Sequence, residues 1–168
     1  IDVFLAGDLL NQIITSNFTA RTMAVPYLGL FNACATSMEG LALAALIVDA
    51  GKAGRVLTGV ASHNAASERQ YRYPTEYGAQ KPPTAQWTVT GAGAAVVAAR
   101  DEPGTGVFIT AATIGRVVDM GIQDPFNMGA AMAPAAVETI EAHFRDLRLD
   151  INHYDLVLTG DLARIGHR

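Results

Sequence analysis

The sequence predicts an α/β domain built around a mixed β-sheet. Short apolar runs alternate along the chain with longer segments of helical periodicity. Half of the 168 residues are hydrophobic and only 17% are charged, a composition typical of a buried sheet. The segment Thr36–Ala50 is apolar on nearly every face, as expected of a helix packed between two layers. Together these observations predict the order βαβαβ, a loop, ββ and αβ.

The first part of the chain is expected to hold three strands joined by two helices. The first helix covers Leu9–Met23 and ends before Pro26, because the residue that precedes a proline avoids helical angles. The second helix, Thr36–Ala50, is closed by Gly51. The strands are expected at residues 2–7, 27–33 and 55–62.

The second part is expected to begin irregularly and then return to strands and one helix. Residues 64–86 form an excursion rich in proline and tyrosine. A strand over Val89–Arg100, with a glycine-rich entry, pairs in a hairpin with Val107–Val118. Pro134 suits the first turn of an amphipathic helix. The last strand is expected at Asp155–Thr159.

Composition narrows the class of protein. A formal net charge of −4, with no block of Lys or Arg, argues against a nucleic-acid-binding surface. One cysteine excludes an internal disulfide framework and suits a reducing compartment. The longest apolar stretch, Leu41–Val48, is too short to cross a bilayer, and no signal peptide precedes it. Any membrane association is therefore expected to be peripheral or through a partner.

Two segments of the chain repeat one another. Asp2–Leu9 and Asp155–Leu162 are both short apolar runs that end in Gly-Asp-Leu. They represent either a duplicated α/β half or convergent chemistry at strand ends. Asp8 and Asp161 are predicted as helix N-caps, with a metal role as the weaker alternative. Because the chain opens inside a strand pattern without a methionine, we expect an interior fragment of a longer protein.

Cys34 lies where an apolar run ends and the apolar helix begins. Unpaired N–H groups and the helix dipole favour a thiolate at such a turn. The same geometry builds a nucleophile, an anion pocket or the floor of a cavity. The alternative is an inert thiol buried in the core.

Two further features are candidates for ligand binding. His63 ends the third strand, where α/β folds gather ligands, and is either a pocket group or a buried histidine with satisfied hydrogen bonds. Among the other histidines, His143 on the amphipathic helix is expected at the solvated surface, and His153, in a turn before a strand, is expected to be structural. His167, near the end of the sequence, allows no interpretation. The excursion supplies cations and flat rings suited to an aromatic dianion, but such loops are equally typical of subunit interfaces. Its candidate residues are Arg69, Tyr71, Arg72, Tyr73, Tyr77 and Lys81.

The Cys34 turn, Asn32–Ser37, and the later Val89–Val97 resemble the thiolase-like superfamily. The resemblance implies duplicated βαβαβαββ halves with mixed five-stranded sheets, of which this chain is an incomplete fragment. Residues 1–105, with the 64–86 excursion, would form the C-terminal part of the first half. Residues 106–168 would begin the second half.

Other segments resemble one branch of this superfamily, found in endospore-forming bacteria. That resemblance implies a homodimer without cofactor that binds dipicolinic acid (pyridine-2,6-dicarboxylate), free or with calcium. It also implies that the protein acts together with stage V channel proteins of sporulation. The protein would be located at the cytoplasmic face or the periphery of the spore inner membrane. The implied ligand-binding residues are Cys34, His63, Asn64, Arg72 and Asp161. The segments that carry the resemblance are Phe4–Gln12, Ser62–Ala65, Glu68–Gly78, Met132–Ala136 and Leu158–Leu162.

The condensing enzymes of the superfamily need a histidine beside the cysteine, after the strand that corresponds to Asp155–Thr159. This sequence has Gly160 there, followed by Asp161. We therefore expect no catalysis, with Cys34 at a vestigial nucleophile position. The alternatives are an acyl-transferring enzyme with Cys34 as nucleophile, and a structural scaffold without a pocket.

Overall fold

The computed structural model describes residues 1–71, 86–99 and 106–166. By contacts, the chain divides into two compact units. The first unit is Ile1–Gln70 with Thr88–Thr110, and the second is Tyr71–Trp87 with Ala111–Arg168. Each unit is described by itself. The predicted boundary between two thiolase-like halves at residue 105 stays a prediction.

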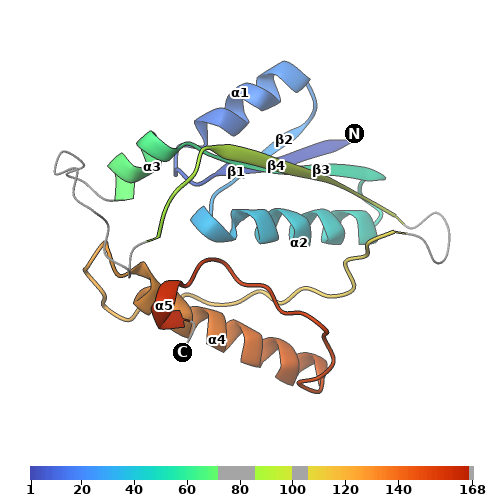
Figure 1. Ribbon diagram of the computed structural model, residues 1–168. Coiled ribbons are helices and arrows are strands. Elements are labelled where there is room, and N and C mark those ends of the chain that lie inside the picture. Colours follow the sequence, from blue (N-terminus) through green and yellow to red (C-terminus); the bar gives the residue numbers. More distant parts are fainter. Residues whose placement is uncertain (72–85, 100–105, 167–168) are drawn as a thin grey trace. The chain divides into compact units, whose positions relative to one another are not determined.

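The first unit is built on a mixed sheet with the strand order β2-β1-β3-β4 (Figure 1). β1 runs parallel to both β2 and β3, and β4 runs antiparallel to β3. The described residues thus confirm a mixed α/β sheet, with four strands. The strands are β1 (Val3–Asp8), β2 (Tyr27–Leu30), β3 (Arg55–Ser62) and β4 (Gly91–Ala98).

Helices cover both faces of this sheet, as Figure 1 shows for α1 (Ile14–Met23) and α2 (Thr36–Asp49). The alternation of side chains along β1 divides the core accordingly. Leu5 packs with Leu30, Val56 and Ala44 of α2. On the other face, its neighbours in β1 pack with α1: Phe4 and Ala6 contact Ala20.

A glycine allows α2 to lie close to the sheet. A Cβ atom built on Gly40 of α2 would collide with Oγ1 of Thr58 in β3. Thr58 is itself buried. The small residue therefore determines how closely this helix approaches the strand.

The excursion expected to be irregular begins with a helix. α3 covers Asn64–Tyr71, directly after β3. Asn64 stabilises its start, because its side-chain Nδ2 donates to the carbonyl oxygen of Thr88 at 2.8 Å. The expectation was therefore wrong for these residues, and 72–85 lie outside the described part of the chain.

The second unit contains α4 (Met128–Leu147) and the short α5 (Ala163–Gly166). Pro134 lies inside α4 and not in its first turn, because the strong helix formers Met and Ala that precede it extend the helix to Met128. The predicted strands Val107–Val118 and Asp155–Thr159 are also wrong, because neither pairs with any described residue. Within the described ranges, no helix has the length and apolar character to span a bilayer.

Candidate functional site

The carboxyl ends of three parallel strands meet at one edge of the first unit's sheet. Gly7 of β1 is in register with Leu30 of β2, and Asp8 is in register with Ala61 of β3. Asp8 is the last residue of β1, Cys34 lies in the turn that follows β2, and His63 directly follows β3. We call this region the strand-end edge; ligands of α/β proteins commonly bind at such edges.

A short, internally bonded turn places Cys34 at this edge. The 3₁₀ turn Ala33–Ala35 is closed by the amide of Asn32, which donates to Oγ1 of the buried Thr36 at 2.9 Å. Ala33 has a φ of 43°, a left-handed conformation that costs a non-glycine residue energy. The Cys34 side chain is exposed, so the alternative of a buried, inert thiol is wrong.

Gly7 makes room for this turn. A side chain there would collide with the carbonyl oxygen of Leu30 and with the methyl group of Thr36. The glycine of the repeated Gly-Asp-Leu motif therefore lets the Cys34 turn pack against the end of β1.

The two repeated aspartates make the same local hydrogen bond, and neither is the N-cap predicted from the sequence. Asp8 is buried, and its Oδ1 accepts from the amide of Leu10 at 3.2 Å. α1 begins only at Ile14, too far along the chain to be capped by Asp8. In the second unit, Oδ1 of Asp161 accepts from the amide of Ala163 at 2.9 Å.

His63 and Asn64 lie at the junction of β3 and α3. The His63 side chain is exposed. The backbone amide of Ala66 donates a hydrogen bond to Nδ1 of His63 at 3.4 Å, so the imidazole caps the start of α3. The buried alternative for His63 is therefore wrong. Asn64 is engaged with Thr88 through its side chain and with Oγ1 of Thr90 through its backbone amide, at 2.9 Å.

The structure brings together only part of the predicted ligand set. Cys34 in the turn after β2, and His63 and Asn64 where β3 meets α3, all lie at the strand-end edge of the first unit. Asp161 belongs to the second unit, and Arg72 lies outside the described residues. In the described part of the chain, no group of three or more His, Cys, Asp or Glu side chains is arranged to hold a metal ion.

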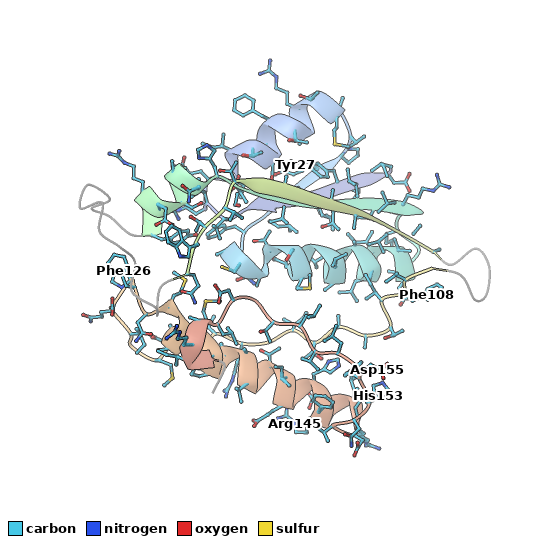
Figure 2. The ribbon with its side chains drawn as sticks, in the orientation of Figure 1. Tyr27, Phe108, Phe126, Arg145, His153 and Asp155 are labelled. Carbon is cyan, nitrogen blue, oxygen red and sulfur yellow. The ribbon has the colours of Figure 1, made fainter. Side chains whose placement is uncertain are left out.

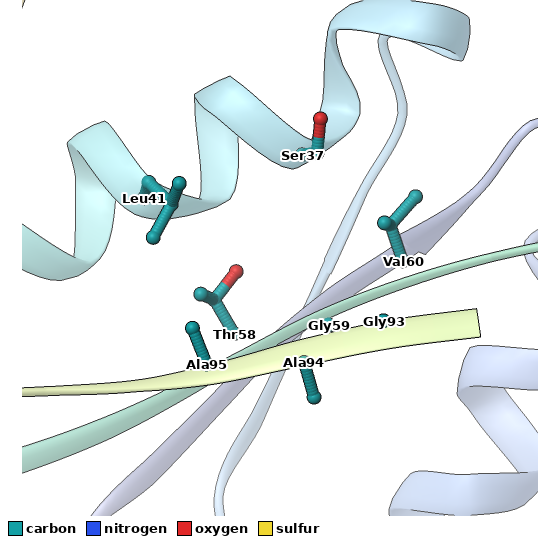
Figure 3. Close-up of a pocket in the computed structure, with 8 residues that line it drawn as sticks. All are labelled: Ser37, Leu41, Thr58, Gly59, Val60, Gly93, Ala94 and Ala95. Carbon is teal, nitrogen blue, oxygen red and sulfur yellow. The ribbon is translucent and has the colours of Figure 1, made fainter.

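Hollows are present in the described part of the first unit. One, of about 210 Å³, lies between α2 and the strands β3 and β4 (Figure 3). Thr58 points from β3 toward α2 in this view, and Leu41 lies opposite it. Gly93 and Ala95 of β4 complete a wall of small side chains. A Cβ atom built on Gly93 would have no neighbour within 4 Å.

A second hollow, of about 340 Å³, lies between the loop after β1 and helix α3. The residues that line it are Leu10, Gln12, Ala66, Arg69 and Gln70. Only Arg69 was a candidate from the sequence. The two glutamines lay in segments that carried the family resemblance, but an uncharged amide gives no signal of its own in a single sequence.

In the second unit, His143 is hydrogen-bonded on both sides of its ring. Its Nδ1 lies 2.8 Å from Oγ1 of Thr113, and its Nε2 lies 2.7 Å from the hydroxyl oxygen of Tyr154. His153, in the segment that follows α4 (Figure 2), meets the Tyr154 ring edge-on at 4.7 Å. The prediction of a solvated surface histidine was therefore wrong for His143.

All 168 residues match the family model of Stage V sporulation protein AD (SpoVAD). Over 166 residues, the chain is 57% identical to Stage V sporulation protein AD of Bacillus subtilis (strain 168). The chain belongs to the SpoVAD family. It covers 48% of the length of that SpoVAD relative, and the match includes 99% of the chain.

Solved structures confirm the fold predicted from the Cys34 turn. The chain is similar to the tetronic acid condensing enzyme AbyA1, with a TM-score of 0.68 and 17% identity, over 99% of this chain and 58% of that one. It is equally similar to OleA of Xanthomonas campestris, with a TM-score of 0.68 and 15% identity, over 99% of this chain and 55% of that one. This SpoVAD chain therefore has a thiolase-like fold.

Proposed function

We propose that this SpoVAD protein binds dipicolinic acid without catalysing a reaction on it, for uptake of the acid into the developing spore. Membership of the SpoVAD family over all 168 residues is the observation that carries the proposal. In this proposal the protein is a homodimer at the periphery of the spore inner membrane. It receives or delivers the acid, free or with calcium, together with stage V channel proteins.

The residue that follows the strand pattern Asp155–Thr159 supports the absence of catalysis. Gly160 stands where the resemblance to condensing enzymes requires a histidine, and it has no side chain with which to polarise a thioester. The next residue, Asp161, brings a carboxylate, which disfavours a developing enolate nearby.

The strand-end edge supports a binding role for the Cys34 region. The turn is internally bonded and its thiol is exposed, so the side chain is accessible without rearrangement. His63 and Asn64 lie at the same edge, where β3 meets α3. A ligand bound at this edge would contact the thiol as one part of the binding surface. The thiol would not need to react with the ligand.

The second candidate function is acyl transfer with Cys34 as nucleophile. It is favoured by the exposed position of the thiol just before α2, where an acyl donor can reach the sulfur. The thiolase-like fold itself is compatible with both functions.

Two measurements on the intact protein separate these functions. Titration calorimetry with pyridine-2,6-dicarboxylate is expected to show binding by the wild type and by Cys34→Ala, and a loss of binding in Cys34→Trp, whose bulky ring blocks the edge. Mass spectrometry after incubation with acyl-coenzyme A thioesters is expected to show no acyl group turning over on Cys34. Turnover of such an adduct would establish the enzyme, and equal affinities of both variants would remove Cys34 from the binding site.

A further inference from the structure

The hollow between the loop after β1 and α3 has an unusual set of polar groups. We call it the Arg69 hollow, and the five residues given above line it. Its polar side chains are the guanidinium of Arg69 and the primary amides of Gln12 and Gln70. None of the described residues that line it carries a carboxylate. The hollow therefore presents one full positive charge and several N–H donors.

These donors have no partners in the described parts of the chain. Arg69 forms no ion pair there, and neither glutamine side chain takes part in a hydrogen bond. The neighbouring acid on α3, Glu68, accepts a hydrogen bond from Oγ1 of Thr88 at 2.8 Å and does not pair with Arg69. An uncompensated guanidinium beside two free amides favours an anion with several acceptor oxygens.

The walls of the hollow are held in place before any ligand arrives. The Leu10 amide is bonded to the buried Asp8, and the Leu10 carbonyl oxygen accepts from the amide of Ile13 at 3.1 Å. On the opposite wall, α3 is anchored by Asn64, whose side chain donates to Thr88. Fixed walls reduce the ordering cost of binding.

The remaining lining residues define the rest of the ligand. Leu10 and Ala66 supply apolar surface beside the donors. A planar carboxylate matches the guanidinium fork with two parallel hydrogen bonds, and an attached apolar body would cover the Leu10 and Ala66 side chains. We propose that the Arg69 hollow binds the carboxylate of a small organic acid. If that acid is dipicolinic acid, the inference rests on the proposed function. The ligand would then contact Arg69 and the other residues of the hollow, which do not include Cys34.

Calorimetric titration of the intact protein tests this site with three probes: pyridine-2,6-dicarboxylate, benzoate and inorganic phosphate. Arg69→Met keeps the length and helix propensity of the side chain but removes its charge. Arg21→Met is the matched control, because Arg21 is an exposed arginine on α1 that does not line the hollow. We expect carboxylate binding to weaken at least tenfold in Arg69→Met and to be unchanged in Arg21→Met. Circular dichroism and thermal melts establish that both variants are folded.

The outcomes distinguish this inference from the proposed function. Benzoate binding that depends on Arg69, without any dicarboxylate binding, would support the hollow and overturn the proposed ligand. Dicarboxylate binding that is unaffected by Arg69→Met but lost in Cys34→Trp would overturn the hollow and support the Cys34 region. Dependence on Arg69 for phosphate alone would overturn the assignment of a carboxylate. Absence of binding by all three probes would overturn both proposals.

Discussion

The two units use a repeated sequence in different ways. In the first unit, the Asp2–Leu9 copy forms β1, paired with a strand on each side, and its Leu5 is fully buried. In the second unit, the Asp155–Leu162 copy forms no strand with any described residue, and Leu158 is 82% exposed. A run of apolar residues therefore does not make a strand by itself, because a strand also needs neighbours to complete its hydrogen bonds.

The aspartates of the two copies separate local from long-range effects. Each accepts a hydrogen bond from the amide two residues further on, at Leu10 and at Ala163. Asp8 is only 3% exposed, whereas Asp161 is exposed. The hydrogen bond is encoded by the residues next to it, but the burial depends on what packs around the strand end.

The largest effect is expected from a substitution in the packed core of the first unit. Gly40→Ala introduces a methyl group against Oγ1 of the buried Thr58. Overpacking of this kind costs roughly 1–3 kcal/mol, more than the helix propensity that alanine gains. Urea unfolding is expected to show this loss of stability.

Gly91→Ala is the matched control for Gly40→Ala. Gly91 begins β4, and a Cβ atom there has no neighbour within 4 Å. The added methyl group is therefore expected to leave stability unchanged within about 1 kcal/mol, because only backbone entropy changes. Equal destabilisation by the two substitutions would contradict the close approach of α2 and β3.

The same contrast explains what could be predicted from the sequence. The sequence predicts β3 and α2 nearly residue by residue, because periodicity and flanking glycines mark both elements locally. Val107–Val118 shows a strand pattern but forms no strand, because pairing is not a local property. Strand prediction succeeded where partners are present in the described chain.

The candidate site was predicted less completely than the fold. The exposed Cys34 turn follows from an apolar run and a helix that meet in the sequence. The Arg69 hollow does not, because Gln12 and Arg69 are brought together only by the parallel pairing of β1 and β3. Nor does a sequence show that Gly7 is required by the approach of the Leu30 carbonyl oxygen.

A smaller effect is expected in the second unit, from Tyr154→Phe. This change removes the hydroxyl group that is bonded to Nε2 of His143 but keeps the ring against Phe144. The loss of one hydrogen bond at the surface is expected to cost about 0.5–1 kcal/mol. Amide hydrogen exchange of residues 150–155 is expected to accelerate, while exchange in the first unit stays constant.

Tyr27→Phe provides the converse experiment in the first unit. The Tyr27 hydroxyl donates to the carbonyl oxygen of Ala6 at 3.3 Å, and its ring stacks near Phe4. Removal of the hydroxyl group is expected to accelerate amide hydrogen exchange in β1 and β2 but not in residues 150–155. If either substitution accelerated exchange equally in both units, the two units would not be independent in stability.

The smallest effect on stability is expected when either of two exposed carboxylates, Asp2 and Asp150, is replaced by an amide. Similar hydrogen bonds lower the pKa values of both carboxyl groups. The amides of Arg55 and Gly54 donate to Asp2 and hold the pKa of its carboxyl below the ordinary 3.8. The backbone and side chain of Asn152 lower the pKa of Asp150 in the same direction. A lowered folded-state pKa adds stability above the unfolded value, which is lost as the pH falls through the folded value.

Acid titration of Asp2→Asn and Asp150→Asn therefore compares a long-range bond with a local one. Asp2, just before β1, accepts hydrogen bonds from the amides of Gly54 and Arg55, which are more than 50 positions away in the sequence. Asp150 accepts from the amide of Asn152, only two positions away. Below about pH 4, wild-type stability is expected to fall more steeply than that of Asp2→Asn. Asp150→Asn is expected to follow the wild type closely in urea unfolding, because a turn between residues two positions apart also forms in the unfolded chain, and the pKa of Asp150 then differs less between the two states. A shallower acid dependence in Asp150→Asn than in Asp2→Asn would mean that the local turn, and not the link between two strands, couples protonation to unfolding.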